Sequence, residues 1–518
     1  MDQSTWYVIA MVIYLAIMLA IGLWSYWRTK KYDDYVLGGR DLHPFVAALS
    51  AGASDMSGWL LMGLPGALFL TGMSEIWIVI GLVLGAWANW TWVAPRLRSY
   101  SEVAGNSITL PSFFENRLRD NSRALRVIAA IIIIFFFTFY VSSGMVAGGR
   151  YFESTFDGSY MTGMLVVAIV TVVYTFVGGF LAVSYTDVVQ GLMMFSALVI
   201  VPIMALISLD NPAEIFSFAS ENPYGTLGIE NPDYFNLVAG VSAAVIIGNV
   251  AWGLGYFGQP HIIVRFMAMR KPSDAKSGRF YGVSWMFISV VGAIFTAIIG
   301  TVFFTETDYR ITDQDSYETI FLDMAQILFH PLIAGLVLTA VLAAIMSTMS
   351  SQLLIVSSSL IEDLWKMLTS KQLPEKTLIA MSRGAVLAIA LIAGVLAINP
   401  SDSILGLVGF AWAGFGSAFG PLVLMALFWK RLNSSGAIAG MVTGAVVSLV
   451  WGMVPATSDL IYEIVPGFLA HVIVAVVVTL MTKEPAAEVQ EEFDRAAKLA
   501  HLAAEDENLD FEEAVDKI

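Results

Sequence analysis

Long apolar stretches separated by short polar connectors run along almost the whole chain. Each stretch is long enough to cross the hydrocarbon core of a bilayer as an α-helix, which takes about 20 residues. The connectors leave no room for a sizeable domain outside the membrane. The pattern predicts an all-α polytopic membrane protein with about 13 transmembrane helices, near residues 6–27, 43–72, 74–95, 125–152, 160–179, 187–208, 235–267, 281–304, 322–357, 377–398, 403–429, 436–454 and 461–482.

Two of these spans carry residues that should interrupt a helix. The second contains a run of small and polar residues from Ser50 to Trp59, and the seventh contains Gly253, Gly255 and Gly258 followed by Pro260. Glycine lowers helix propensity and proline removes a backbone donor, so each span should unwind locally. Freed backbone groups within a membrane are stable only where they line a cavity or bind a ligand. The breaks therefore indicate the discontinuous helices of a secondary transporter.

The positions of the two breaks also predict an internal repeat. Each break opens a set of five spans, and an odd number of helices inverts the second set relative to the first. We therefore expect two inverted five-helix repeats with broken first helices. The expected units are residues 1–42, an extra N-terminal helix and cytoplasmic loop; 43–208, the first repeat; 235–429, the second repeat; 436–482, two C-terminal helices; and 483–518, an acidic cytoplasmic tail.

The distribution of charge predicts the orientation in the membrane. Placing the N-terminus outside puts every Lys and Arg except Arg150 and Arg310 on the inner side or at inner helix ends. This asymmetry favours an outer N-terminus and a cytoplasmic C-terminus. The net charge of −15 arises mostly from residues 484–518, which hold twelve acidic and three basic residues and so contribute −9. The acidic balance is largely a property of the tail and indicates no nucleic-acid partner.

The sequence offers no residue set for catalysis. Cysteine is absent, which excludes disulfides, thiolate metal sites and cysteine nucleophiles, and the five histidines have no paired metal spacing. The phosphate-binding, zinc-protease and serine-hydrolase motifs are also missing from the sequence. We therefore expect a protein that is not an enzyme and has no cofactor.

Five long strings are distinctive, at residues 36–67, 178–191, 253–268, 342–354 and 409–424. They resemble the sodium:solute symporter family, in order and with few shifts between residues 6 and 482. The resemblance implies the inverted-repeat fold shared with neurotransmitter-type sodium symporters. It also implies sodium-coupled import of L-proline by alternating access in a bacterial inner membrane, with Na⁺ as the coupling ion. A symporter for another small amino acid or carboxylate is the first alternative, and a membrane sensor or channel on a transporter-like core is the second. The sequence specifies no oligomeric state.

Asp55 is the first candidate residue for binding or guiding a cation. A carboxylate near the bilayer centre is costly and usually marks an ion pathway, although Asp55 could instead bond the freed backbone of its own break. Whether it touches the ion stays open at this point. Sodium is a hard cation that prefers oxygen ligands. The resemblance implies sodium ligands at the carbonyls of Ala53, Met56 and Ala344 and the hydroxyls of Ser347 and Thr348.

Aromatic residues near the second break are candidates for binding the transported solute. Trp252 and Tyr256 are spaced i, i+4 and share a face if the helix persists. Such rings suit a small apolar ring, and amides near Ser57 suit a carboxylate. The alternative is that the rings only pack or form an interfacial belt. The resemblance implies substrate-binding roles for Tyr140, Trp252, Tyr256 and Pro260, with Ser57 near both sites.

Arg40 and Asp187 fall at the expected cytoplasmic ends of the second and sixth spans. Charged residues at helix ends are usually anchors whose charge reaches the interface. The resemblance implies a gate or ion-exit role for both.

Overall fold

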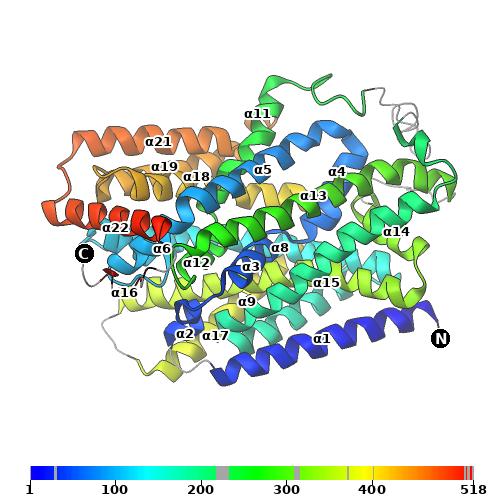
Figure 1. Ribbon diagram of the computed structural model, residues 1–518, viewed down its shortest axis with the longest axis horizontal. Coiled ribbons are helices and arrows are strands. Elements are labelled where there is room, and N and C mark those ends of the chain that lie inside the picture. The colour runs from blue at the N-terminus through cyan, green and yellow to red at the C-terminus, as the bar shows by residue number, and fades with distance from the viewer. Residues whose placement is uncertain are drawn as a thin grey trace.

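The protein is an elongated bundle of helices, described here from a computed structural model (Figure 1). The structure describes residues 2–28, 32–216, 233–307, 316–369, 373–400 and 402–506, with 509, 511, 514 and 515 beyond them. Within those residues the only strand-like pairing is an isolated bridge between Leu42 and Met269. The prediction of an all-α polytopic protein is confirmed.

The helices follow one another with short connections. Their bounds are α1 Gln3–Arg28, α2 Tyr32–Leu37, α3 Pro44–Asp55, α4 Leu64–Thr71, α5 Ile76–Ala88, α6 Ala94–Val103, α7 Leu110–Leu118, α8 Ala124–Phe156, α9 Tyr160–Ser208, α11 Ala243–Ala251, α12 Pro260–Met267, α13 Asp274–Glu306, α14 Ile320–Leu328, α15 Pro331–Ser358, α16 Lys366–Leu368, α17 Glu375–Ala397, α18 Ile404–Phe428, α19 Ser434–Met453, α20 Pro455–Ser458, α21 Ile464–Met481 and α22 Ala487–Glu505.

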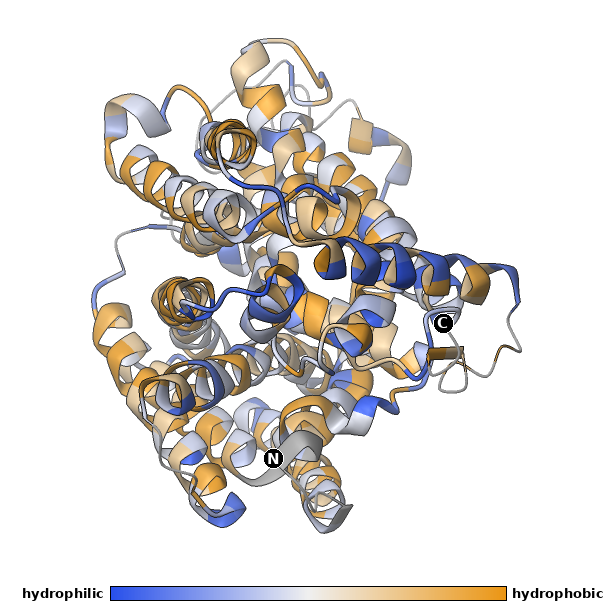
Figure 2. Cartoon of the chain, turned by 90° about the vertical axis from the view of Figure 1, so that its left-hand side faces the viewer, coloured by the Kyte–Doolittle hydropathy of each residue, from blue (hydrophilic) through white to orange (hydrophobic). Residues whose placement is uncertain are grey.

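Ten helical segments in the described part of the chain are long and apolar enough to cross a membrane, or 11 when one bent pair is included. Shorter apolar helices at Tyr160–Phe176 and Ala243–Gly258 occupy the positions of the fifth and seventh expected spans. Hydrophobic residues predominate along most of the helices, and hydrophilic ones gather on connecting segments and along one helix near the C-terminus (Figure 2). The count of 13 spans, the inverted repeats and the unit boundaries stay predictions.

The first predicted break is confirmed. Helix α3 ends at Asp55, and the chain leaves the helical conformation at Met56, with φ −81° and ψ 81°. A wide π-turn over Trp59–Gly63 then leads into α4, and the two halves meet at a bend of 62°. The Asp55 carbonyl accepts hydrogen bonds from the Ser57 amide at 2.9 Å and the Trp59 indole at 3.0 Å. Part of the freed backbone is therefore satisfied locally.

The second predicted break is confirmed as well. Helix α11 tightens into a 3₁₀ turn over Trp252–Gly258, and Gln259 is extended before Pro260 opens α12. Glycine is required at Gly255 because a Cβ there would run into the indole of Trp412. The close approach of α18 to this turn thus depends on the glycine pattern seen in the sequence.

Two other predictions about the spans are wrong. The expected connector between residues 179 and 187 is helical from Gly179 onward, and the polar residues that suggested a connector are buried. Gly179 itself has φ 61°, a conformation that glycine adopts without strain and that breaks α9 at this point. The expected ninth span, 322–357, is divided into α14 and α15 by an extended Phe329.

The acidic tail contains an amphipathic helix that packs on the rest of the protein. Helix α22 lies beside α6 near the C-terminus (Figure 1) and buries Phe493 against the ring of Tyr100. Its acidic face pairs with basic residues, Glu492 with Arg119 and Asp494 with Lys430. The negative charge of the tail therefore partly offsets positive charge at one end of the bundle.

Candidate functional site

Oxygen atoms from the first break and from α15 converge in the middle of the bundle. The Ser347 hydroxyl donates to the Ala53 carbonyl at 2.7 Å and to the Ala344 carbonyl at 2.9 Å. The Thr348 hydroxyl reaches the same Ala53 oxygen at 3.4 Å. Met56 is buried at the end of α3, three residues after Ala53. Residues almost 300 positions apart thus bring together four of the five oxygen-bearing residues expected around sodium.

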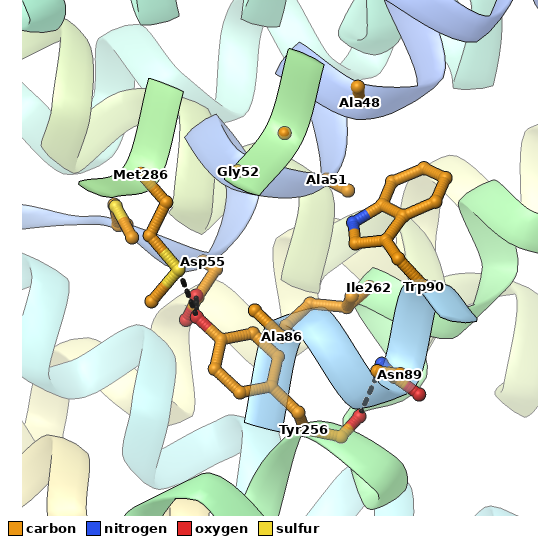
Figure 3. A pocket seen from close by; sticks show the side chains of 12 residues that line it. Ala48, Ala51, Gly52, Asp55, Ala86, Asn89, Trp90, Tyr256, Ile262 and Met286 are labelled. Atoms are coloured by element: carbon orange, nitrogen blue, oxygen red, sulfur yellow. Dashed lines mark hydrogen bonds between the residues drawn. The ribbon is translucent and has the colours of Figure 1, made fainter. Parts of the chain in front are cut away.

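The Asp55 carboxylate bonds to the second break, and among the described residues it makes no hydrogen bond with that oxygen cluster. One of its oxygens accepts a hydrogen bond from the Tyr256 hydroxyl, and the other has no hydrogen-bond partner among the described residues. Both side chains line a cavity of about 20 Å³, enough for a single water molecule (Figure 3). Asn89, across the cavity, donates to the Tyr256 backbone carbonyl at 2.9 Å. Asp55 therefore joins the two breaks.

Aromatic rings form a continuous column from Asp55 to the far end of the second break. Trp412, from α18, meets the ring of Tyr256 edge-on at 5.1 Å and stacks on Trp252 at 6.3 Å between centroids. Trp252 stacks in turn on Tyr462 at 5.2 Å. The expected grouping of Trp252 and Tyr256 is therefore realised through Trp412, which lies between them.

The remaining candidates for solute binding are buried, but they are not gathered around one cavity. The Tyr140 ring lies edge-on to His261 at 5.8 Å, and its hydroxyl has no hydrogen-bond partner in the part of the chain that the structure describes. The Ser57 hydroxyl accepts the Trp59 amide at 3.4 Å inside the first break. Pro260 lines a different small cavity.

Arg40 and Asp187 lie in different settings. Arg40 is bonded at the end of the bundle to the Ser107 carbonyl, at 2.7 Å, and to the Met267 carbonyl, at 2.8 Å. Asp187 was expected at a helix end and is instead eight residues inside the helical stretch that starts at Gly179, about 12 Å along its axis. This prediction is corrected because the helix starts earlier than the hydropathy pattern indicates.

Asp187 belongs to a buried polar network that sequence reasoning missed. Its side chain is fully buried and pairs with Arg265 at 3.2 Å, while the Ser50 hydroxyl donates to it at 2.7 Å. Arg265 also donates to the Ser50 and Ser351 hydroxyls, at 3.0 and 2.7 Å. Ser50 lies one turn before Ala53, and Ser351 one turn after Ser347. The network thus holds together the helices that carry the oxygen cluster.

Comparison with known proteins places these features in a family. The model of the sodium:solute symporter family matches residues 35–444. The chain is 51% identical over 481 residues to the high-affinity proline transporter PutP of Bacillus subtilis (strain 168), covering 92% of this chain and 98% of the relative. It is 46% identical over 504 residues to the sodium/proline symporter of Escherichia coli (strain K12), covering 97% of this chain and 98% of the relative.

Among solved structures, the fold is similar to that of a Na⁺-coupled sialic acid symporter in a substrate-bound, outward-open state. The TM-score is 0.78 at 19% sequence identity, and the match covers 94% of this chain and 100% of the other. At 19% sequence identity, this similarity supports a shared fold and nothing further.

Proposed function

The chain belongs to the sodium:solute symporter family, and from that premise we propose that it imports L-proline together with Na⁺ by alternating access. It is a multi-pass membrane transporter. The relatives at 46 and 51% identity are named as proline transporters, and for this reason we take L-proline as the solute. The location is the inner membrane of a bacterium, with the N-terminus outside and the C-terminus in the cytoplasm.

The main support for the proposal is that the Ser347 and Thr348 hydroxyls both lie within hydrogen-bond distance of the Ala53 carbonyl oxygen. In the proposal a dehydrated Na⁺ binds between α3 and α15, with the Ala53, Met56 and Ala344 carbonyls and both hydroxyls as ligands. Oxygen ligands suit a hard cation. The ion replaces the hydroxyl-to-carbonyl bonds and fixes the end of α3, so that sodium orders the first break before the solute binds.

The solute in the proposal binds between the two breaks after the helices there move apart, because the present cavity holds only a single water molecule. Tyr140, Trp252, Tyr256 and Pro260 provide the apolar surface for the proline ring, and Ser57 offers polar groups to its carboxylate. The Tyr140 hydroxyl and one Asp55 oxygen, which have no hydrogen-bond partner within the described ranges, supply acceptors for its ammonium group. Asp55 also guides the cation toward its site, and Arg40 and Asp187 act at the inner gate and ion exit. No step in this cycle needs an enzymatic reaction.

Substitution of the hydroxyl ligands tests the sodium site. Ser347→Ala and Thr348→Ala should each raise the Na⁺ concentration for half-maximal proline uptake about ten-fold, equivalent to about 1.4 kcal/mol. High Na⁺ should restore most of the maximal rate because the carbonyl ligands persist. Sodium titrations of uptake in proteoliposomes, matched for folded protein, provide the measurement.

Ser357→Ala is the matched control for this experiment. Ser357 is buried on the same helix, and its hydroxyl only bonds back to the Leu354 carbonyl at 2.9 Å. The Na⁺ concentration for half-maximal uptake by Ser357→Ala should equal that of the unmodified protein. Unshifted curves for both Ser347→Ala and Thr348→Ala would remove α15 from the ion site.

A further inference from the structure

The second break leaves the backbone carbonyl of Tyr256 without its usual partner. In a continuous α-helix this carbonyl would accept the N–H of residue 260, but residue 260 is a proline and has no N–H. The side-chain amide of Asn89 donates to the Tyr256 carbonyl instead, at 2.9 Å (Figure 3). Asn89 is fully buried. Because a buried carbonyl without a donor is costly, Asn89 offsets the cost that Pro260 creates.

Asn89 reaches the second break because α5 packs against it backbone to backbone. Gly81, Gly85 and Asn89 follow one another at intervals of four residues and therefore lie on one face of this helical stretch. A Cβ on Gly81 would collide with the Val250 carbonyl, and one on Gly85 with the Gly253 carbonyl. The two glycines thus allow an approach that a larger residue would prevent. Asn89, one turn further along the same face, is thereby placed against the same break.

A wide π-turn begins at Asn89 and covers Asn89–Val93, and the Ala94 N–H closes it on the Asn89 carbonyl. Such turns insert one residue into a helix and are frequent at functional sites. The next residue, Trp90, places its ring edge-on to Phe266 of α12, at 4.6 Å between centroids. Asn89 therefore holds the chain before the break, and Trp90 packs on the helix after it. Consecutive residues of the π-turn contact both halves of the broken seventh span.

We propose that Asn89 is a positioning residue for solute binding, which aims the Tyr256 hydroxyl at Asp55. The inference rests on the proposed function. The Tyr256 hydroxyl occupies one oxygen of the Asp55 carboxylate, and the other oxygen, which has no partner among the described residues, is left for the ammonium group of the solute. Since the carbonyl and the ring belong to one residue, fixing the carbonyl on Asn89 also fixes the direction of the hydroxyl. In this role Asn89 acts through Tyr256 and makes no contact with the solute.

Asn89→Ala is the direct test, because it removes the donor to the Tyr256 carbonyl. The Kd for radiolabelled proline, measured on the purified protein at saturating Na⁺, should rise about ten-fold. The Kd for Na⁺, measured without proline, should change less than about two-fold, because among the described residues no hydrogen bond joins Asn89 to Ser347 or Ala53. An unchanged Kd for proline, or an equal loss of affinity for Na⁺, would overturn the proposal.

Thr91→Val is the matched control. Thr91 lies in the same π-turn, and its hydroxyl donates to the Trp87 carbonyl at 2.6 Å and accepts from Arg279 at 3.0 Å, outside both breaks. The Kd of Thr91→Val for proline should equal that of the unmodified protein. Asn89→Val fills the space of the amide with an apolar side chain, so it provides the same comparison if Asn89→Ala does not fold. Its Kd for proline should also rise about ten-fold, and normal proline binding by folded Asn89→Val would refute the role of Asn89.

A double variant distinguishes positioning of the hydroxyl from general support of the fold. Tyr256→Phe removes the hydroxyl that Asn89 aims, and it should raise the Kd for proline about ten-fold as well. If both residues act through this hydroxyl, Asn89→Ala combined with Tyr256→Phe should bind proline about as weakly as either single variant. Losses that multiply to about 100-fold would contradict the proposal, because Asn89 would then act by another route. Sodium-driven proline uptake by the unmodified protein tests the proposed function separately and does not depend on the result for Asn89.

Discussion

Asp55→Asn should reduce sodium-driven proline uptake at least about 100-fold, equivalent to about 2.7 kcal/mol. Asp55 is the only carboxylate in the first break. Its charge balances a dehydrated cation at a depth where an unbalanced charge costs a few kcal/mol. The amide keeps the size of the side chain and removes that balance. Raising Na⁺ should therefore rescue this variant far less than Ser347→Ala. Uptake in proteoliposomes across a range of Na⁺ concentrations provides the measurement.

Tyr256→Phe separates this role from a purely structural one. The substitution removes the hydroxyl that donates to Asp55 and keeps the ring that packs on Trp412. If Asp55 serves the ion, Tyr256→Phe should retain much more uptake than Asp55→Asn. Equal losses in both variants, or a normal sodium titration in folded Asp55→Asn, would leave Asp55 as a structural partner of Tyr256.

Arg265→Ala should destabilise the folded protein by about 3–5 kcal/mol, because it leaves Asp187 buried without its cation. Asp187 is fully buried, Arg265 is 1% exposed, and the network contains two further hydroxyls from α3 and α15. The purified variant should melt well below the unmodified protein in detergent. Thermal unfolding followed with and without Na⁺ provides the measurement.

Pairing Arg265→Met with Asp187→Asn tests whether the unpaired charge causes that loss. Removing both charges should restore most of the stability, since a buried ion pair contributes little more than neutral side chains of similar size. If the network also controls ion release, the double variant should fold and still transport poorly. A single Arg265→Ala variant as stable as the unmodified protein would refute the argument.

The sequence alone predicts the parts of the site that depend on local chemistry. The small residues around Asp55 and the glycines before Pro260 predict both breaks, since helix propensity is a local property. The resemblance points to the hydroxyls of Ser347 and Thr348, and the structure brings both to the Ala53 carbonyl.

The sequence does not show which residues far apart along the chain contact one another in the fold. Arg265 and Asp187 are 78 residues apart in the sequence, and no local pattern pairs them. The polar residues around Asp187 resemble a connector, because the hydropathy of a loop and that of a helix with buried polar side chains are alike. Trp412 is one of many aromatic residues in apolar spans, and its place between Trp252 and Tyr256 depends on how α18 packs against the second break.

Uptake of radiolabelled L-proline by the purified protein in proteoliposomes tests the central claim most directly. An inward Na⁺ gradient should drive accumulation above the external concentration, and a membrane potential, negative inside, should increase it. One net charge moved is equivalent to about 2.3 kcal/mol per 100 mV, or roughly 50-fold in accumulation. Replacing Na⁺ by choline or K⁺ should abolish accumulation. Equal accumulation in sodium-free buffer under a proton gradient would contradict sodium coupling.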